Sequence, residues 1–168
     1  MPPGTEHRPT RRQDDVLGIS RPRQGWWHWL RDPHFVVAVL AAVPVWVALG
    51  LVAGDRMRPN DTLTALISFL VVQPIVEELV FRGVLQGHLL SRGWTRRSGP
   101  VSSANLAATA AFSALHLLAQ PPEWAIAVAV PSLVFGHLRE RFGSVLPAIV
   151  LHAIYNGGFA FTAWCVQH

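Results

Sequence analysis

The apolar residues of this chain gather into five long runs that short polar stretches separate. A helix needs about 20 mostly apolar residues, in a usual range of about 17 to 25, to cross the hydrocarbon core of a bilayer. The runs lie at residues 35–52, 63–90, 101–118, 124–138 and 145–166. The fourth is short by this measure. The pattern predicts an all-α fold, a polytopic transmembrane helix bundle of about five to six membrane helices.

The second run is too long for one straight span. We expect a bend at Pro74 or at Gly83, or an end of the helix that lies along the membrane surface. The third run is rich in alanine and serine, as close packing of helices in lipid requires. The segment WWHWLRD, residues 26–32, precedes the first run and is typical of an aromatic belt at a cytoplasmic interface.

Composition supports the membrane interpretation. Hydrophobic residues make up 51% of the chain and charged residues only 14%, unlike an ordinary soluble domain. All 14 basic residues are arginine. We predict a disordered basic cytosolic tail over residues 1–24 and a single transmembrane helical domain over residues 25–168. The tail lacks interleaved aromatic residues, so no nucleic-acid partner is predicted. The one cysteine, Cys165, excludes an intramolecular disulfide.

The loops predict the orientation of the chain, because arginine accumulates on the cytoplasmic side of membrane proteins. With the tail inside, two further loops fall inside. They carry Arg92, Arg96 and Arg97, and Arg139 and Arg141. The loop AQPPEW falls outside and has no arginine. We therefore predict an integral membrane protein with a cytoplasmic N-terminus.

The segment IVEELVFRG, residues 75–83, places three charges inside the second run. An ionised side chain at the bilayer centre costs about 2.5 to 3.5 kcal/mol on insertion scales, so these groups must face a protein interior or a water-filled cavity. Glu78 and Arg82 are four residues apart on one helical face, which predicts a structural pair. Adjacent helical positions point about 100° apart, so Glu77 needs another partner.

Polar residues in two other runs are candidate partners. His116 follows Phe112 by one helical turn, and Asn156 follows His152 by one turn. A single histidine in an apolar helix is more often a packed core residue than a catalyst. A carboxylate pair, two histidines and an asparagine on three spans instead predict one functional polar cluster, with the active site inside the bundle.

Three segments, EELVFRG at 77–83, FSALH at 112–116 and HAIYN at 152–156, follow one another in the chain. They resemble the Glu-Glu-x-x-x-Arg, Phe-x-x-x-His and His-x-x-x-Asn motifs of the CAAX prenyl protease and bacteriocin-processing family, the type II CAAX endopeptidases. These are intramembrane endopeptidases of the glutamic type. The resemblance covers about residues 63–159, the expected catalytic core. The chain is shorter than typical members and is similar to short bacterial ones, which implies the bacterial cytoplasmic membrane.

Peptide hydrolysis needs an activated water, stabilisation of an oxyanion and a proton for the leaving amine. We expect Glu77 to act as general base on a water shared with His116. By the resemblance, His152 and Asn156 donate hydrogen bonds to the oxyanion. The predicted catalytic residues are Glu77, His116, His152 and Asn156. The predicted structural or orienting residues are Glu78, Arg82 and Phe112.

Two alternatives to a metal-free protease stay open. The first is a zinc-dependent version, because two histidines and a glutamate are legitimate zinc ligands. No His-Glu-x-x-His motif is present, and we predict no metal ligand and no cofactor. The second is a non-enzymatic membrane adaptor of the same fold. A proton or ion pathway would also use intramembrane glutamate and histidine.

The expected partners are membrane lipid and a membrane-anchored protein or peptide substrate. The small size and all-arginine composition favour a sorting protease that removes C-terminal anchors. The sequence makes no prediction of oligomeric state. At 1.5 Å per residue, Glu77 lies roughly 20 Å from the ends of its run, His116 about 22 Å and His152 about 10 Å from their inner ends. These depths require bends at Pro74 and Pro147, or a later start of the third span.

Overall fold

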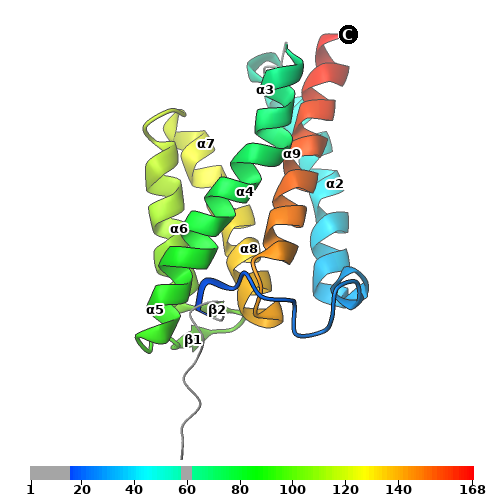
Figure 1. The fold of residues 1–168 in the computed structure, drawn as a ribbon. Coiled ribbons are helices and arrows are strands. Elements are labelled where there is room, and N and C mark those ends of the chain that lie inside the picture. Colours follow the sequence, from blue (N-terminus) through cyan, green and yellow to red (C-terminus); the bar gives the residue numbers. More distant parts are fainter. Residues whose placement is uncertain (1–15, 58–61) are drawn as a thin grey trace, which may run out of the picture.

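The computed structural model describes residues 16–57 and 62–168, and almost all of its elements are helices (Figure 1). The helices are η1 (His28–Arg31), α2 (Pro33–Ala53), η2 (Gly54–Arg56), α3 (Leu63–Ile67), η3 (Ser68–Val72), α4 (Gln73–Glu78), η4 (Leu79–Gln86), α5 (Gly87–Ser91), α6 (Ser103–His116), α7 (Pro122–Ala127), α8 (Ala129–Phe142) and α9 (Leu146–Gln167). A short antiparallel hairpin, β1 (Arg97–Ser98) and β2 (Val101–Ser102), joins α5 to α6. The predicted all-α fold is confirmed.

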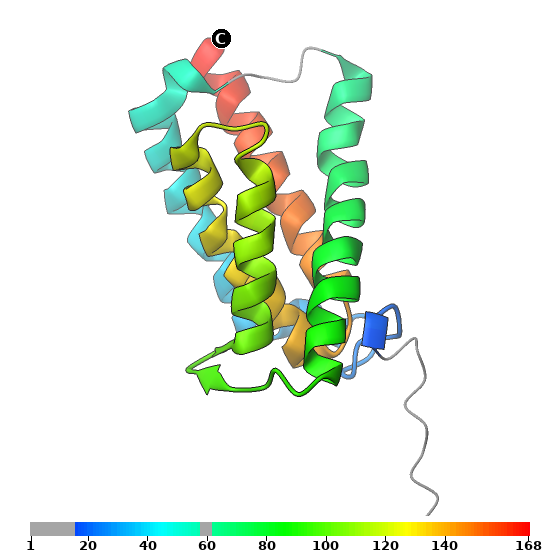
Figure 2. The ribbon, with the colours of Figure 1, turned by 90° about the vertical axis from the view of Figure 1, so that its left-hand side faces the viewer.

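Successive passes along the bundle are made by α2, the continuous α3–α5 unit, α6, the α7–α8 pair and α9 (Figures 1 and 2). Within the described residues, three stretches are long and apolar enough to cross a membrane, namely Pro33–Arg56, Leu63–Ser91 and Leu146–Gln167. The predicted third and fourth runs form shorter helices. α6 has 14 residues, about 21 Å of helix, which is less than the roughly 30 Å of a bilayer core.

The second span is one continuous helix with two π-helical segments, η3 and η4. The first ends directly before Gln73 and Pro74, and the second contains Gly83. A π-helical turn holds one residue more than an α-helical turn, so it changes the rotation of the helix without breaking it. The two positions at which we expected a bend are therefore the places where the winding of this helix changes.

The main apolar core lies where α2, α8 and α9 pack together at the lower half of the bundle in Figure 1. Its buried members are Trp29, Phe35, Ala38, Phe135, Leu138, Phe142, Ala148 and Leu151. Trp29 also donates its indole N–H to the carbonyl oxygen of Trp26 at 2.7 Å, which satisfies the one polar group of that ring.

Apolar side chains also cover the outside of the long helices. Leu40 and Leu51 on α2 are 63% and 83% exposed, and Phe161 on α9 is 66% exposed. Such a surface is far too apolar for water, but it matches the hydrocarbon of a bilayer. The outer faces of the three long helices are therefore lipid-facing.

The segment of residues 16–24 packs across one end of the bundle, and here the structure differs from the predicted disordered tail. The backbone N–H of Val145 donates to the carbonyl oxygen of Gly18 at 2.8 Å, and the N–H of Arg23 donates to that of Phe142 at 2.9 Å. The packed domain therefore includes residues 16–24, which precede its predicted start at residue 25. The remainder of the predicted tail, residues 1–15, lies outside the described residues.

This segment was missed because its apolar residues are few and scattered, with no run long enough to predict an element. One of them, Pro22, is nevertheless fully buried. At that end of the bundle the segment lies beside the β1–β2 hairpin and the start of α2 (Figure 1). The loops that carry most of the arginines therefore share one end, and the C-terminus lies at the other.

The turn between α8 and α9 packs against this segment. Gly143 ends α8 with φ of 67°, a left-handed conformation that favours glycine. Ser144 and Val145 are 1% and 4% exposed. In Figure 1, α9 starts above the lower end of the bundle, and His152, in its second turn, reaches both Glu77 and Glu78. Pro147 stands in the first turn of α9 and produces no bend there.

Candidate active site

Glu77 and Glu78 occupy the last two positions of α4, directly before the π-helical segment η4. Since adjacent helical residues point about 100° apart, the two carboxylates face different surroundings. Glu78 is fully buried, whereas the side chain of Glu77 keeps 25% of its surface exposed. Only Glu77 therefore has direct access to a space in which a water or a substrate could stand.

Glu78 and Arg82 form the ion pair that their spacing predicted. Arg82 Nε lies 3.3 Å from Glu78 Oε2, and both side chains are 0% exposed. That contact is not aligned as a hydrogen bond. Arg82 Nη2 instead donates to the carbonyl oxygen of Ser132 at 2.9 Å and to its hydroxyl at 2.7 Å. The guanidinium carbon also lies 5.3 Å from the ring centre of Phe112. Arg82 therefore ties the second span to α6 and α8.

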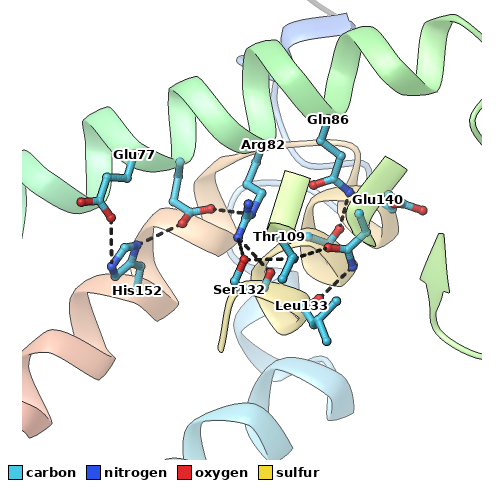
Figure 3. A network of polar contacts seen from close by, with 11 residues as sticks. Glu77, Arg82, Gln86, Thr109, Ser132, Leu133, Glu140 and His152 are labelled. Atoms are coloured by element: carbon cyan, nitrogen blue, oxygen red, sulfur yellow. Dashed lines mark hydrogen bonds and ion pairs between the residues drawn. The ribbon is translucent and has the colours of Figure 1, made fainter. Parts of the chain in front are cut away.

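His152 on α9 lies between the two carboxylates (Figure 3). Its Nδ1 is 3.0 Å from Glu78 Oε1, and its Nε2 is 3.8 Å from Glu77 Oε2. The imidazole stacks on Phe135 with ring centres 4.8 Å apart and planes 18° apart. The partner that Glu77 needed is thus His152. Two spans more than 70 positions apart in the chain supply the two sides of this contact.

Hydrogen bonding fixes which nitrogen of each candidate histidine carries a proton. Carboxylate and carbonyl oxygens only accept hydrogen bonds. His152 Nδ1 faces the carboxylate of Glu78, and His116 Nδ1 lies 2.9 Å from the carbonyl oxygen of Phe112. Both Nδ1 atoms must therefore donate. In each neutral ring Nε2 is then an acceptor, and it becomes a second donor only when the ring is protonated.

His116 is the last residue of α6 and stands one aromatic ring away from His152. Its ring centre lies 4.4 Å from that of Phe112, which in turn lies 6.3 Å from that of His152. In the described part of the chain, His116 has no direct polar contact with Glu77. The structure therefore brings the three motifs together around Phe112, and a water shared by Glu77 and His116 stays a prediction.

Asn156 follows His152 by one turn of α9 and makes a backbone contact. Its Nδ2 donates to the carbonyl oxygen of Phe69 at 2.8 Å. Phe69 belongs to η3, where the π-helical winding changes the carbonyl partners. One N–H of the amide is used in this way, and the second remains for another acceptor. The structure does not itself test the oxyanion role of Asn156.

A chain of polar contacts that the sequence did not predict extends the site through α6 and α8 (Figure 3). Ser132 Oγ donates to Thr109 Oγ1 at 2.9 Å, and Thr109 Oγ1 donates to Asn105 Oδ1 at 3.3 Å. Asn105 Nδ2 donates to the carbonyl oxygen of Leu133 at 2.9 Å. The signal in the sequence was weak: Asn105 and Thr109 are polar and four residues apart, but serines and threonines occur throughout that run.

A second unpredicted set of contacts fixes the next turn of the catalytic helix. The fully buried Gln86 donates through Nε2 to the carbonyl oxygen of Gly136 at 3.0 Å and to Glu140 Oε1 at 2.8 Å. Glu140 also accepts from Arg97 Nη2 at 2.6 Å and from the hydroxyl of Ser102. Arg82 and Gln86 thus make two successive contacts with α8, one helical turn apart.

The possibility of a metal was tested against the positions of the donor side chains. Among residues 16–57 and 62–168, no three His, Cys, Asp or Glu side chains gather closely enough to hold an ion. Glu77 Oε2 and His152 Nε2 could supply two ligands to one ion. A third ligand from His116 would require movement of that side chain past Phe112. The zinc-dependent alternative therefore has two placed ligands and not three.

Together the fold and the site define a class: a helical integral membrane protein whose carboxylate–histidine site lies between two spans. The model of the family described as type II CAAX prenyl endopeptidase Rce1-like matches residues 59–158, more than half of the chain and every candidate site residue. The chain belongs to this protease family, as the resemblance of its motifs indicated. Neither the curated proteins nor the solved structures gave a match.

Proposed function

We propose that this chain is an intramembrane endopeptidase that uses glutamate and histidine to activate water. The observation that carries the proposal is the contact between Glu77 and His152. The partly exposed carboxylate of Glu77 stands 3.8 Å from Nε2 of the imidazole, and the buried carboxylate of Glu78 holds the Nδ1 side of the same ring. Membership of a protease family supports the same reaction class. A purely structural role would not require Glu77 to be charged and accessible in a membrane span.

In the proposed mechanism, a water next to Glu77 loses a proton to the carboxylate as it attacks the substrate carbonyl carbon. The carbonyl oxygen becomes an oxyanion and is stabilised by hydrogen-bond donors. Glu77 then returns the proton to the leaving amine, which breaks the C–N bond. His116 orients the water from the side of Phe112. The proton that Glu77 takes from the water is the proton that the amine receives, and no electrons are gained or lost, so these steps need no redox cofactor.

His152 suits the oxyanion role because Glu78 holds its ring in place. Nδ1 lies 3.0 Å from Glu78 Oε1, which leaves Nε2 on the side of Glu77, and Nε2 donates to the oxyanion when the ring carries both protons. Asn156, with its remaining N–H, would supply the second donor. Arg82 keeps Glu78 in place, so the buried ion pair acts as a positioning device for His152 and does not touch the substrate.

We further propose that the substrate is a membrane-associated protein or peptide with a hydrophobic C-terminal segment. The enzyme would reside in the bacterial cytoplasmic membrane. The arginine-rich end of the bundle would face the cytoplasm, as the distribution of arginine in its loops favours. The lipid-facing apolar surface supports a substrate that approaches within the bilayer.

The first test is cleavage of candidate proteins with hydrophobic C-terminal tails by the purified protein in lipid vesicles. We expect Glu77→Ala and His116→Ala to reduce the rate by about 100-fold or more. Matched controls are Glu123→Ala and His88→Ala, which change an exposed glutamate and an exposed histidine away from the site. Equal cleavage by all variants would contradict the mechanism and favour the membrane adaptor.

The cofactor requires its own test. Metal analysis of the active protein, followed by a chelator titration of the cleavage rate, separates the two protease mechanisms. A rate that a chelator leaves unchanged, with less than one ion per ten chains, is the expected result. Loss of the rate on chelation and its return with zinc would establish the zinc-dependent version, with Glu77 and His152 as the first ligands to examine.

A further inference from the structure

The imidazole of His152 lies against an aromatic side chain that the sequence did not place in the site. Phe135 on α8 stacks on it, with ring centres 4.8 Å apart and planes 18° apart. Phe112 on α6 approaches the same imidazole at 71°, with ring centres 6.3 Å apart. All three side chains are buried. Two rings from different helices therefore enclose the imidazole, one over its face and one at a steep angle.

The contact with Glu78 alone does not determine the plane of this ring. It holds one atom, Nδ1, at 3.0 Å from Glu78 Oε1. The torsion that turns a histidine ring has broad energy minima, so the imidazole would be free to tilt about that atom and carry Nε2 away from Glu77. Stacking on Phe135 removes this freedom, because a tilted ring would collide with a closely packed, buried neighbour.

Phe135 is itself held in place by the core of the bundle. It belongs to the apolar cluster in which α2, α8 and α9 pack together. The ring of Tyr155 lies 5.5 Å from it between centres, and the hydroxyl of Tyr155 donates to the carbonyl oxygen of Ala38 on α2 at 2.8 Å. The packing of three helices therefore sets the position of the ring on which His152 stacks.

Helix α8 reaches His152 by two routes that start one turn apart. Ser132 accepts from Arg82, and Arg82 pairs with Glu78, the carboxylate that contacts Nδ1. Phe135 follows Ser132 by three positions and so lies on the same face of α8. The first route places one atom of the imidazole, and the second places its plane. A helix that carries none of the predicted catalytic residues thus orients one of them.

We propose that Phe135 is a positioning residue that sets the ring plane of His152 and, with it, the direction of Nε2. Its effect on catalysis rests on the proposed function, in which Nε2 donates to the oxyanion. A hydrogen bond weakens steeply once its angle falls below about 120°, so a ring that tilts stabilises the oxyanion less. The loss falls on the chemical step and not on substrate binding, because Phe135 is buried and contacts the imidazole, not the substrate.

The first measurement reads the ring directly and needs no cleavage. The full chain, labelled with ¹³C and ¹⁵N in its histidines, is placed in lipid nanodiscs, and the NMR signals of His152 are assigned by their loss in His152→Gln. A ring proton that lies over an aromatic face is shifted upfield. We expect Phe135→Leu to move the His152 ring signals to their ordinary position, and Phe135→Tyr, which keeps the aromatic ring, to retain the upfield shift.

Phe142→Leu is the matched control. Phe142 is a second buried phenylalanine of α8 in the same apolar cluster, but its ring packs on Trp29, 6.5 Å away between centres. The two leucine variants remove the same atoms from the same core, and we expect both to lower Tm. Only Phe135→Leu should move the signals of His152.

The second measurement is the cleavage rate, at a temperature where all variants are folded. We expect Phe135→Leu to lower kcat by about 10- to 100-fold with KM unchanged, Phe135→Tyr to recover most of kcat, and Phe142→Leu to keep both constants. His152 signals that Phe135→Leu leaves in place overturn the proposal, and so does an equal loss of kcat in the two leucine variants. If the wild type cleaves nothing while the signals move as expected, the proposed function fails and the placement of the imidazole by Phe135 stands.

Discussion

Arg82 occupies the most demanding position in this protein. Its charge is fully buried in a membrane span, and three elements supply its partners: Glu78 from its own helix, Ser132 from α8 and the ring of Phe112 from α6. Each contact offsets part of the cost of removing a guanidinium from water. The arrangement explains why the charges in this segment are tolerated, because they neutralise one another inside the protein and not toward lipid.

Replacing Arg82 by Met should lower the free energy of unfolding by about 3 to 5 kcal/mol, because the buried carboxylate of Glu78 loses its guanidinium partner and keeps only His152. The double variant Glu78→Gln/Arg82→Met should lose less free energy of unfolding than Arg82→Met alone, since the buried charge of Glu78 is removed together with its partner. Denaturant unfolding in bicelles, followed by circular dichroism, measures both. A double variant less stable than the single one would contradict this account of the pair.

Asp32 provides a pH-dependent prediction outside the spans. It caps α2 by accepting from the N–H of His34 at 3.0 Å, and it pairs with Arg141 Nη2 at 2.8 Å. The hydrogen bond from Arg141, opposed by burial and aided by Gln24 and His34, lowers the pKa of Asp32 from 3.8 to about 2. Since the folded pKa is the lower one, this stabilisation is complete above pH 3.8 and is lost as the pH falls toward 2.

Thermal unfolding measured between pH 5 and about pH 2 should therefore show a fall in Tm that Asp32→Asn lacks. The asparagine keeps an oxygen for the cap but has no charge to titrate. Asp32→Ala loses both the cap and the pair, and should be less stable than Asp32→Asn at pH 7 by about 1 kcal/mol. An identical pH profile in wild type and Asp32→Asn would show that other carboxylates control acid unfolding.

The residues of the site were predictable to different degrees. The pairing of Glu78 with Arg82 followed from their spacing on one helix, a local property. The need of Glu77 for a second partner followed from helix geometry as well. That this partner is His152, and that His152 also holds Glu78, depends on how deep α9 starts, which the sequence of α9 does not determine. The same holds for the contact of Asn156 with a carbonyl of η3.

Contacts between helices give a prediction for Ser132, which connects α8 to both Arg82 and Thr109. Ser132→Ala should cost about 1 to 3 kcal/mol of stability, because Arg82 and Thr109 lose a buried partner. Ser113 on α6 is a matched control, since its buried hydroxyl has no hydrogen-bond partner among residues 16–57 and 62–168. Ser113→Ala should be neutral or slightly stabilising. Parallel unfolding curves of the two variants measure the difference, and equal losses would contradict the role of Ser132.

Helices were predicted well where hydrophobicity alone forms them, and less well where packing does. α2 and α9 match their predicted runs closely, because each is continuous, apolar and exposed to lipid. The fourth run breaks into α7 and α8 at Val128, and α6 ends at His116 and leaves two apolar leucines beyond it. Hydropathy counts apolar residues but does not register where a helix stops against its neighbours.

The N-terminal segment gives a prediction about the assembled bundle. A Cβ on Gly87 would lie 2.1 Å from the carbonyl oxygen of Val16, a backbone atom that cannot move aside easily. Gly87→Ala should therefore displace residues 16–24, with faster hydrogen exchange there and a lower Tm. Gly157→Ala is the control, because its Cβ would meet only a side-chain atom of Leu70 at 3.9 Å.

Gly157→Ala should raise stability by about 0.5 to 1 kcal/mol through helix propensity. Opposite signs for the two glycine variants would support close packing of the N-terminal segment on the catalytic helix. Unchanged exchange of residues 16–24 in Gly87→Ala would contradict it.

The docking of residues 16–24 has a consequence for the synthesis of the chain. Val16 and its partner Arg139 are 123 positions apart, so at about 5 to 20 residues per second the segment leaves the ribosome roughly 6 to 25 s before α8 does. During that interval the first spans enter the membrane while the segment has nothing to pack against. A segment that is made before every span is therefore among the last to reach its native position, and that end of the bundle closes only after α8 has been made.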